Sequence, residues 1–148
     1  MIGVVIAAFM HYEGAAKYVI VENIATDRDY QSSGVNIIGP AHHIAMRHCD
    51  VSDAQGAILI YDNVNNIVVF NNHIHDCGNM SAAGDIDDNG VIIGEGTDCW
   101  VLDNLVRHCV GSGIVLNPGF GEPNSQINHC YIGRNQVHNV RQSGAWSK

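Results

Sequence analysis

Acidic side chains gather in one loop, where Asp85, Asp87 and Asp88 are followed directly by Asn89 and a glycine. Oxygen ligands at alternate positions, followed by a glycine, open the loop of many calcium-binding proteins. Asp85, Asp87 and Asn89 are therefore candidate calcium ligands. The match ends before the last carboxylate of such loops, because Gly96 occupies that position. The alternative is a solvated acidic loop without a metal.

Asp87 and Asp88 are also candidates for acid–base chemistry. Hydrolysis of a glycosidic bond uses two carboxyl groups, one that donates a proton and one that accepts a proton or attacks the sugar. Adjacent carboxylates are also common in loops, so the alternative interpretation is again a solvated acidic segment.

His75, Arg107 and His138 occupy the same position in a repeated block of sequence. If the blocks stack, these three side chains form an outward column. Such a column would suit an anionic sugar, because arginine pairs with a carboxylate and histidine moves a proton near neutral pH. The alternative is that stacked strands simply place similar polar residues above one another. The pair His42-His43 could ligate a metal only together with distant partners.

The repeated block covers residues 67–77, 99–109 and 130–140, and residues 44–51 form an earlier copy. Each block contains two short strands with alternating apolar residues, joined by a tight turn and followed by a strand that starts with glycine. These strands start at Gly3, Gly34, Gly56, Gly90, Gly113 and Gly144. Three short strands per repeat and about five repeats predict an all-β solenoid, a parallel β-helix that forms one domain over residues 1–148.

Asn72, Asn104 and Asn135 fall on the same turn of successive blocks, and Cys49 takes that place one block earlier. Rungs of a β-helix lie about 4.8 Å apart, so the three side-chain amides are expected to bond to one another as an asparagine ladder.

The five cysteines include no CxxC pair, which argues against a zinc ribbon. Cys77 matches Cys109, and Cys99 matches Cys130, in adjacent blocks. We expect free thiols packed in the core, a state that favours a reducing compartment.

The blocks Trp100–Asn104 and Tyr131–Asn135 resemble the right-handed β-helix repeats of the pectate-lyase-like superfamily. The resemblance implies a right-handed single-stranded parallel β-helix, and it implies fold far more than chemistry. Members include polysaccharide lyases, glycoside hydrolases, uronate epimerases and phage tailspikes, and Asp87-Asp88 resembles the paired aspartates of polygalacturonase-type hydrolases. Complete members have a capping helix and many more rungs, so we expect a short or partial member. Either the chain is a piece of a longer protein or its ends are covered by another subunit, and we favour the second alternative.

Composition excludes several classes of function. The 148 residues carry a formal charge of −8 and are 46% hydrophobic, which argues against nucleic acid as a partner, because phosphate binding depends on Lys and Arg. The sequence contains no apolar stretch of membrane-spanning length. The apolar start lacks the basic region of a signal peptide. We expect a soluble protein.

The outward positions of the glycine-led strands are expected to be nearly all apolar: Val5, Asn36, Ile58, Ile92, Val115 and Trp146. An exposed apolar row of this length favours protein association, or cover by a loop, over sugar chemistry. The sequence therefore predicts a non-catalytic interaction module. It would self-associate through this row or through open β-helix ends, with a polysaccharide as a further partner and no cofactor other than calcium. The alternative is a uronate polysaccharide lyase or glycoside hydrolase that uses Asp87 and Asp88 with His75, Arg107 or His138.

Overall fold

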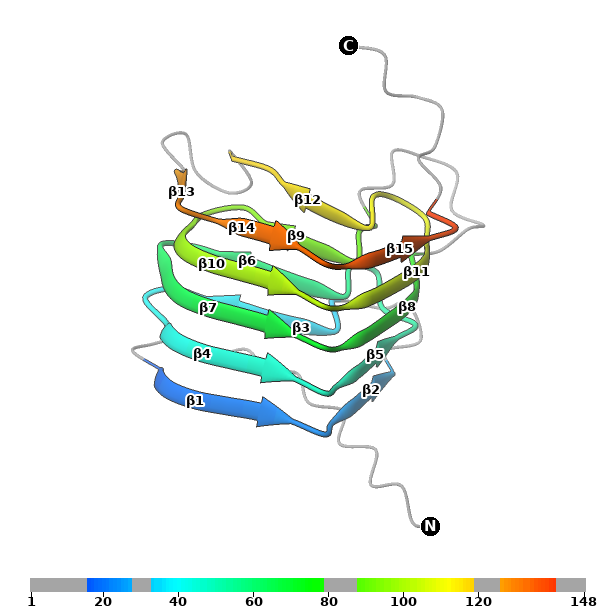
Figure 1. Ribbon diagram of the computed structural model, residues 1–148, viewed down its shortest axis with the longest axis horizontal. Helices are drawn as coiled ribbons and strands as arrows, with labels where there is room; N and C mark the ends of the chain where they lie inside the picture. Colours follow the sequence, from blue (N-terminus) through cyan, green and yellow to red (C-terminus); the bar gives the residue numbers. More distant parts are fainter. Residues whose placement is uncertain (1–15, 28–32, 79–87, 119–125, 141–148) are drawn as a thin grey trace.

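The computed structural model describes residues 16–27, 33–78, 88–118 and 126–140. Over these ranges the regular structure consists of strands alone, and the strands pair in parallel. In Figure 1 the chain runs along one sheet, turns into a second and returns through a third, one level higher after each circuit. The sense of this rise makes the coil right-handed, which confirms the predicted parallel β-helix. None of the described residues belongs to a helix that could cross a membrane.

Three parallel sheets form the sides of the coil. The first sheet contains β1 (Lys17–Glu22), β4 (His42–Arg47), β7 (Val64–Phe70), β10 (Gly96–Leu102), β13 (Ile127–Asn128) and β14 (Tyr131–Gly133). The second contains β2 (Ala25–Asp27), β5 (Asp50–Ser52), β8 (His73–Cys77), β11 (Leu105–Cys109) and β15 (Gln136–His138). The third contains β3 (Val35–Ile38), β6 (Ile58–Tyr61), β9 (Val91–Ile93) and β12 (Ile114–Leu116). Each of the first four rungs takes one strand from each sheet, as predicted.

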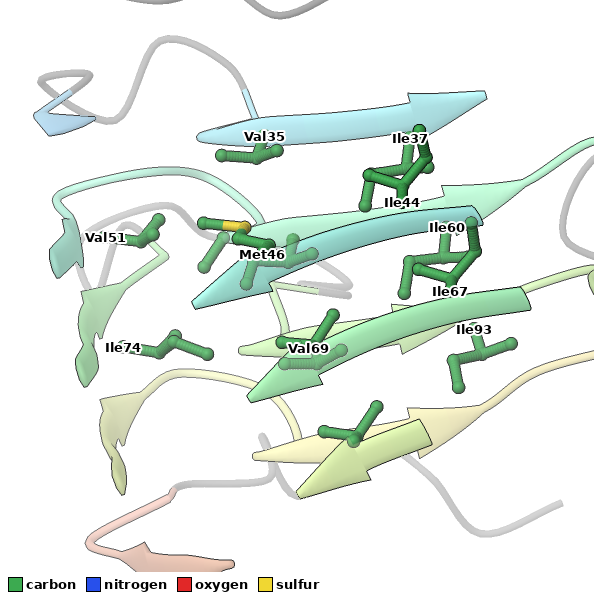
Figure 2. Close-up of a cluster of buried hydrophobic side chains, with 14 of the residues drawn as sticks. Val35, Ile37, Ile44, Met46, Val51, Ile60, Ile67, Val69, Ile74 and Ile93 are labelled. Carbon is green, nitrogen blue, oxygen red and sulfur yellow. The ribbon is translucent and has the colours of Figure 1, made fainter. Parts of the chain in front are cut away.

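The core is a set of aliphatic columns inside the coil (Figure 2). Alternate residues of each strand point inward, and the parallel register places like residues of successive rungs above one another. Two such columns are Met46–Val69–Val101 from the first sheet and Val51–Ile74–Val106 from the second. These side chains are almost fully buried. Burial of each contributes roughly 1.5–3 kcal/mol, so rung stacking supplies the main driving force for the fold.

The predicted asparagine ladder is present at the turn between the first and second sheets. Asn104 Oδ1 accepts hydrogen bonds from the backbone N and from Nδ2 of Asn72, each 2.9 Å long. Asn135 Oδ1 accepts the equivalent pair from Asn104, at 2.9 and 3.0 Å. Asn72 Oδ1 accepts the backbone N–H of Cys49 at 2.9 Å, so the ladder continues into the rung where cysteine replaces asparagine.

Left-handed backbone conformations recur at three places in the rungs, with φ between 50° and 58°. The first column lies within the first sheet: Tyr18, His43, Asn66, Asp98 and His129. The second lies at the turn before the second sheet: Asn23, His48, Asn71, Asp103 and Arg134. The third lies near the end of the second sheet: Asp53, Asp76, His108 and Asn139. Asn, Asp and His tolerate this conformation best among residues other than glycine, which explains most of these residue types.

The register of the third sheet corrects one part of the repeat. Val35 pairs with Ile58, so the column of strand-opening glycines passes through Ala57 and not through Gly56. Ile58 consequently points inward and is fully buried, and Leu59 takes the outward position. The prediction of an outward Ile58 was wrong because two candidate starting residues adjoin, and a shift of one residue reverses every side chain of a strand.

The predicted exposed apolar stripe on the third sheet is therefore not found. Ile92 is only 2% exposed, and Asn36 and Val115 are half-buried. Val5 and Trp146 lie outside the described residues. An outward apolar row runs instead along the first sheet, in register from rung to rung. We call it the apolar row: Ile20, Ala45, Val68, Trp100 and Tyr131.

Candidate functional site

The outward face of the second sheet carries a cluster of histidine, aspartate and arginine side chains that could do chemistry. In β8, Ile74 points into the core, and the neighbouring His73 and His75 point outward. The left-handed residue Asp76 then allows Cys77 to point inward again. We call this surface the histidine face: Asp50, His73, His75, Asp76, Arg107, His108 and His138.

The predicted column of His75, Arg107 and His138 is confirmed as an arrangement. Arg107 on β11 pairs in register with His75 on one side and with His138 on the other. His75 and Arg107 are half-buried, whereas His138 is exposed. The three side chains thus stand one rung apart on the histidine face.

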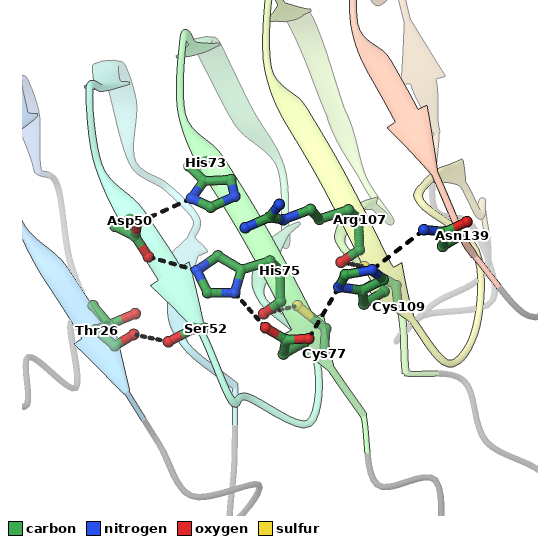
Figure 3. Close-up of polar contacts among 11 residues, drawn as sticks. Thr26, Asp50, Ser52, His73, His75, Cys77, Arg107, Cys109 and Asn139 are labelled. Carbon is green, nitrogen blue, oxygen red and sulfur yellow. Dashed lines mark hydrogen bonds and ion pairs between the residues drawn. The ribbon is translucent and has the colours of Figure 1, made fainter.

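Asp50 links two histidines of the next rung. Its Oδ2 lies 3.0 Å from Nδ1 of His73, and its Oδ1 lies 2.9 Å from Nε2 of His75. The two imidazole rings stack with centroids 4.2 Å apart (Figure 3). Asp50 and His73 are register partners, so the carboxylate reaches one ring directly beside it and a second ring diagonally.

Asp76 holds the other side of the His75 ring. Its Oδ2 lies 2.6 Å from Nδ1 of His75, and its Oδ1 lies 3.2 Å from Nδ1 of His108. Both ring nitrogens of His75 therefore face carboxylates. His108 also contacts Asn139 of the next rung, with its Nε2 3.3 Å from Nδ2 of Asn139.

These contacts shift two pKa values. Burial lowers the pKa of His75, but the hydrogen bonds and negative charges of Asp76 and Asp50 outweigh it, so the pKa lies above its ordinary value. The hydrogen bond from His75 lowers the pKa of Asp76, assisted by the positive charges of His75 and His108. Both shifts favour a protonated His75 beside an ionised Asp76 at the centre of the histidine face.

Arg107 is the described arginine without a carboxylate partner. Arg47 is 2.7 Å from Glu22, and Arg134 makes two bonds to Asp103, the shorter 2.6 Å. Arg107 forms no such ion pair with any residue in the described ranges, and its Nε is buried without a hydrogen-bond partner there. Figure 3 shows the Arg107 side chain extending across β8 toward His73 and His75.

The acidic loop contributes less to this surface than the sequence suggested. Asp85 and Asp87 lie outside the described residues. Asp88 is 5% exposed and packs tightly, since a Cβ at Gly78 would lie 2.4 Å from its own Cβ. Asn89 Oδ1 accepts the backbone N–H of Ser112 at 2.6 Å. The proposed calcium oxygen of Asn89 is thus already used within the fold, and calcium binding stays a prediction.

His42 and His43 contact each other, with their Nδ1 atoms 2.8 Å apart. His43 belongs to the first left-handed column, which gives this residue a structural explanation. Within the described ranges, the only three potential metal ligands that come close together are Asp50, His73 and His75.

The cysteines stack as predicted and carry free thiols. Cys77 pairs in register with Cys109 inside the second sheet. Burial raises the pKa of Cys99 to about 12, with a further contribution from Cys130 in the adjacent rung. These thiols therefore act as small core residues.

Four members of the histidine face were not predicted as site residues: Asp50, His73, Asp76 and His108. The block alignment did contain a signal, because it places Asp50 and His73 at the same repeat position. It could not show the diagonal contact from Asp50 to His75, which depends on side-chain reach across rungs.

Comparison with known protein families supports the same architecture. A family described as "Right handed beta helix region" matches residues 6–146. Comparison with curated proteins found no match, and comparison with solved structures found none either.

Proposed function

The chain belongs to the family of right-handed β-helix proteins, and from that premise we propose that it is a non-catalytic module that binds acidic polysaccharides through its histidine face. A β-helix supports enzymes as well as binding proteins, so the family alone does not select between them. The choice depends on the chemistry of the exposed side chains.

The observation that carries the proposal is the guanidinium of Arg107, which has no carboxylate partner among the residues that the structure describes. An arginine presents its N–H groups as a planar fork that matches a carboxylate in two parallel hydrogen bonds. Arg134 is paired in this way with Asp103, and Arg47 bonds to Glu22 through its Nε. Arg107 lies half-buried on a polar face without a carboxylate partner in the described ranges. A uronate carboxylate would supply the missing partner.

The repeat of the coil suits a polymer. Ser52, His75, Arg107 and His138 follow one another in register along the helix axis. Successive rungs are about 4.8 Å apart, so a linear polysaccharide lying along this column meets a polar side chain at each rung. Several weak contacts then add up along one chain.

Binding is favoured over catalysis by the state of the acid–base candidates. A general acid or base must reach the proton that it transfers. Both ring nitrogens of His75 already face carboxylates, and Asp88 is nearly buried. The contacts of these residues suit a fixed binding surface better than a proton relay.

The test is a binding titration with oligogalacturonate and oligomannuronate, with a neutral glucan for comparison. We expect the two acidic oligosaccharides to bind and Arg107→Ala to weaken binding about 10- to 150-fold, because a hydrogen bond to a charged group contributes roughly 1.5–3 kcal/mol. Arg134→Ala is the matched control, since its guanidinium is already paired with Asp103 and lies at the turn between the first and second sheets.

Equal affinity of the wild type and Arg107→Ala for the acidic oligosaccharides would refute the proposal. Release of unsaturated or reducing sugar during the titration would instead establish the alternative, a polysaccharide lyase or glycoside hydrolase. Substitution of Asp87 and Asp88 by asparagine would then show whether those residues carry the reaction.

A second activity, self-association, is supported by the apolar row on the first sheet. Ile20 and Tyr131 in this row are 60% and 53% exposed. Two copies present rows with the same rung spacing, so they can pack against each other in register. We expect a dimer or larger oligomer by light scattering at micromolar concentration, and a monomer after Val68→Lys. A wild-type monomer at that concentration would refute this second proposal.

A further inference from the structure

We propose that Asp50, His73 and His75 form a binding site for a divalent transition metal ion of the zinc type. Asp50 lies on β5, and both histidines lie on β8 in the next rung. One carboxylate oxygen and one ring nitrogen of each histidine lie within 4.8 Å of one another. Two imidazoles and one carboxylate are a ligand set that zinc and related ions use, with a further position left open.

The separations between these atoms are close to those of a coordination sphere. Zinc bonds to imidazole nitrogen and carboxylate oxygen are about 2.0–2.2 Å long, so neighbouring ligands of a tetrahedral ion lie roughly 3.4 Å apart. His73 Nδ1 and His75 Nε2 lie 3.0 and 2.9 Å from the two oxygens of Asp50. Small side-chain rotations therefore make room for an ion without moving the strands.

Asp76 supplies the support that metal-binding histidines usually have. Its Oδ2 lies 2.6 Å from Nδ1 of His75, and the opposite nitrogen, Nε2, faces Asp50. A carboxylate in this position fixes the orientation and tautomer of the ring. The left-handed backbone of Asp76 and its contact to His108 in turn hold the carboxylate in place.

The ligands stand on rigid elements and can be reached from solvent. Asp50 and His73 are register partners in the middle of the second sheet, where β5 and β8 are each paired on both sides. Side-chain exposures of 18% for His75, 29% for His73 and 49% for Asp50 leave the site open to an entering ion. A preformed and accessible site needs little reorganisation to bind.

The charges around the site also suit a cation. The carboxylates of Asp50 and Asp76 lie at hydrogen-bonding distance from the histidines. Arg107 approaches the two rings from β11, on the side opposite Asp50 (Figure 3). The ion would lie between β5 and β8, with the histidine pair between it and the guanidinium. Imidazole ligands favour zinc, copper or nickel over calcium and magnesium.

The metal site shares His75 with the proposed polysaccharide column, but the two proposals depend on different residues. The ion would be held by β5 and β8, whereas the proposed sugar contact depends on Arg107 of β11. Loss of one activity without the other is therefore observable.

The test is a calorimetric titration of zinc chloride into the full chain after treatment with a chelator. We expect one ion per chain. His73→Ala and Asp50→Asn should each weaken binding by more than about 100-fold, and Asp76→Asn by about 10- to 100-fold, as for other supporting carboxylates. His138→Ala is the matched control on the same face, and it should bind zinc like the wild type.

Cobalt absorption spectra give a second measurement. We expect bands of nitrogen and oxygen ligation and no thiolate charge-transfer band, which separates this site from the cysteines. Far-ultraviolet circular dichroism of each metal-free variant verifies its folding, and His75→Gln replaces His73→Ala if the latter does not fold. Absence of a stoichiometric ion, a thiolate spectrum, or equal zinc affinity of His138→Ala and a folded His73→Ala or His75→Gln variant would overturn the proposal.

Discussion

Replacement of Asn104 by alanine removes the centre of the asparagine ladder. The Asn104 side chain is completely buried. It donates hydrogen bonds to the carbonyl of Val69 and to Asn135 Oδ1, each 3.0 Å long. It accepts two from Asn72, each 2.9 Å long. The substitution therefore removes two donated and two accepted bonds.

The expected loss of stability follows from the groups left behind. The backbone N–H of Asn72 loses its acceptor in a buried position, which costs about 1–3 kcal/mol. The other lost bonds contribute roughly 0.5–1.5 kcal/mol each, and they are not fully additive because their partners are neighbours. We expect the free energy of unfolding to fall by about 3–5 kcal/mol, a large part of the 5–15 kcal/mol typical of a folded domain.

The assay is equilibrium unfolding in urea, followed by circular dichroism and by tryptophan fluorescence. Coincident transitions and an unchanged slope are required before the difference is interpreted as stability. Asn135→Ala is the matched control. It lies half-buried at the last described step of the ladder, where water can replace the lost acceptor, so we expect about 1–2 kcal/mol. A loss for Asn104→Ala no larger than that of Asn135→Ala would refute the reasoning.

Three further predictions concern other features of the coil. In metal-free protein, His75 should titrate by NMR with a pKa above its ordinary value. The contribution of His75 to stability is then complete below the unfolded pKa of about 6.5, and it is lost as the pH rises through the pKa of the folded protein. An NMR titration midpoint of His75 below its ordinary pKa would contradict this prediction. A thiol reagent should modify half-buried Cys130 in the native protein far faster than buried Cys99, whose pKa is about 12, as mass spectrometry of the labelled peptides would show. Gly90→Ala should destabilise the protein by about 1–3 kcal/mol in urea, because its Cβ would lie 2.4 Å from a carbonyl oxygen. Gly56→Ala, whose nearest neighbour is 3.4 Å away, should change stability by less than about 0.5 kcal/mol.

The sequence was sufficient to predict the β-helix because similar residue types recur at the same position of each rung. Residues that recur once per block, such as Asn72 and Asn104, must lie on one column when blocks stack, and the ladder follows directly. The column of His75 and Arg107 was predictable for the same reason. The third sheet was harder, because Gly56 and Ala57 are both small and the choice between them sets the direction of every following side chain.

The cluster around Asp50 could not be predicted because it depends on contacts between different columns. A block alignment compares like positions, whereas Asp50 meets His75 two residues further along the next strand. The apolar row was overlooked because Val68 and Trp100 alternate with buried residues in strands whose last four residues are all apolar. The Asp50 cluster depends on how far side chains reach across rungs, and the apolar row depends on which face of the first sheet is exposed. A block alignment gives neither quantity.

The left-handed columns have a consequence for how this surface can change during evolution. Their requirement falls on the main chain, so Asn, Asp, His and even Tyr18 and Arg134 satisfy it. An exchange among these residue types alters charge, metal affinity or proton exchange at a fixed place while leaving the scaffold intact. Each column therefore offers positions at a constant spacing where the residue type can change. New chemistry can arise at these positions without repacking the core.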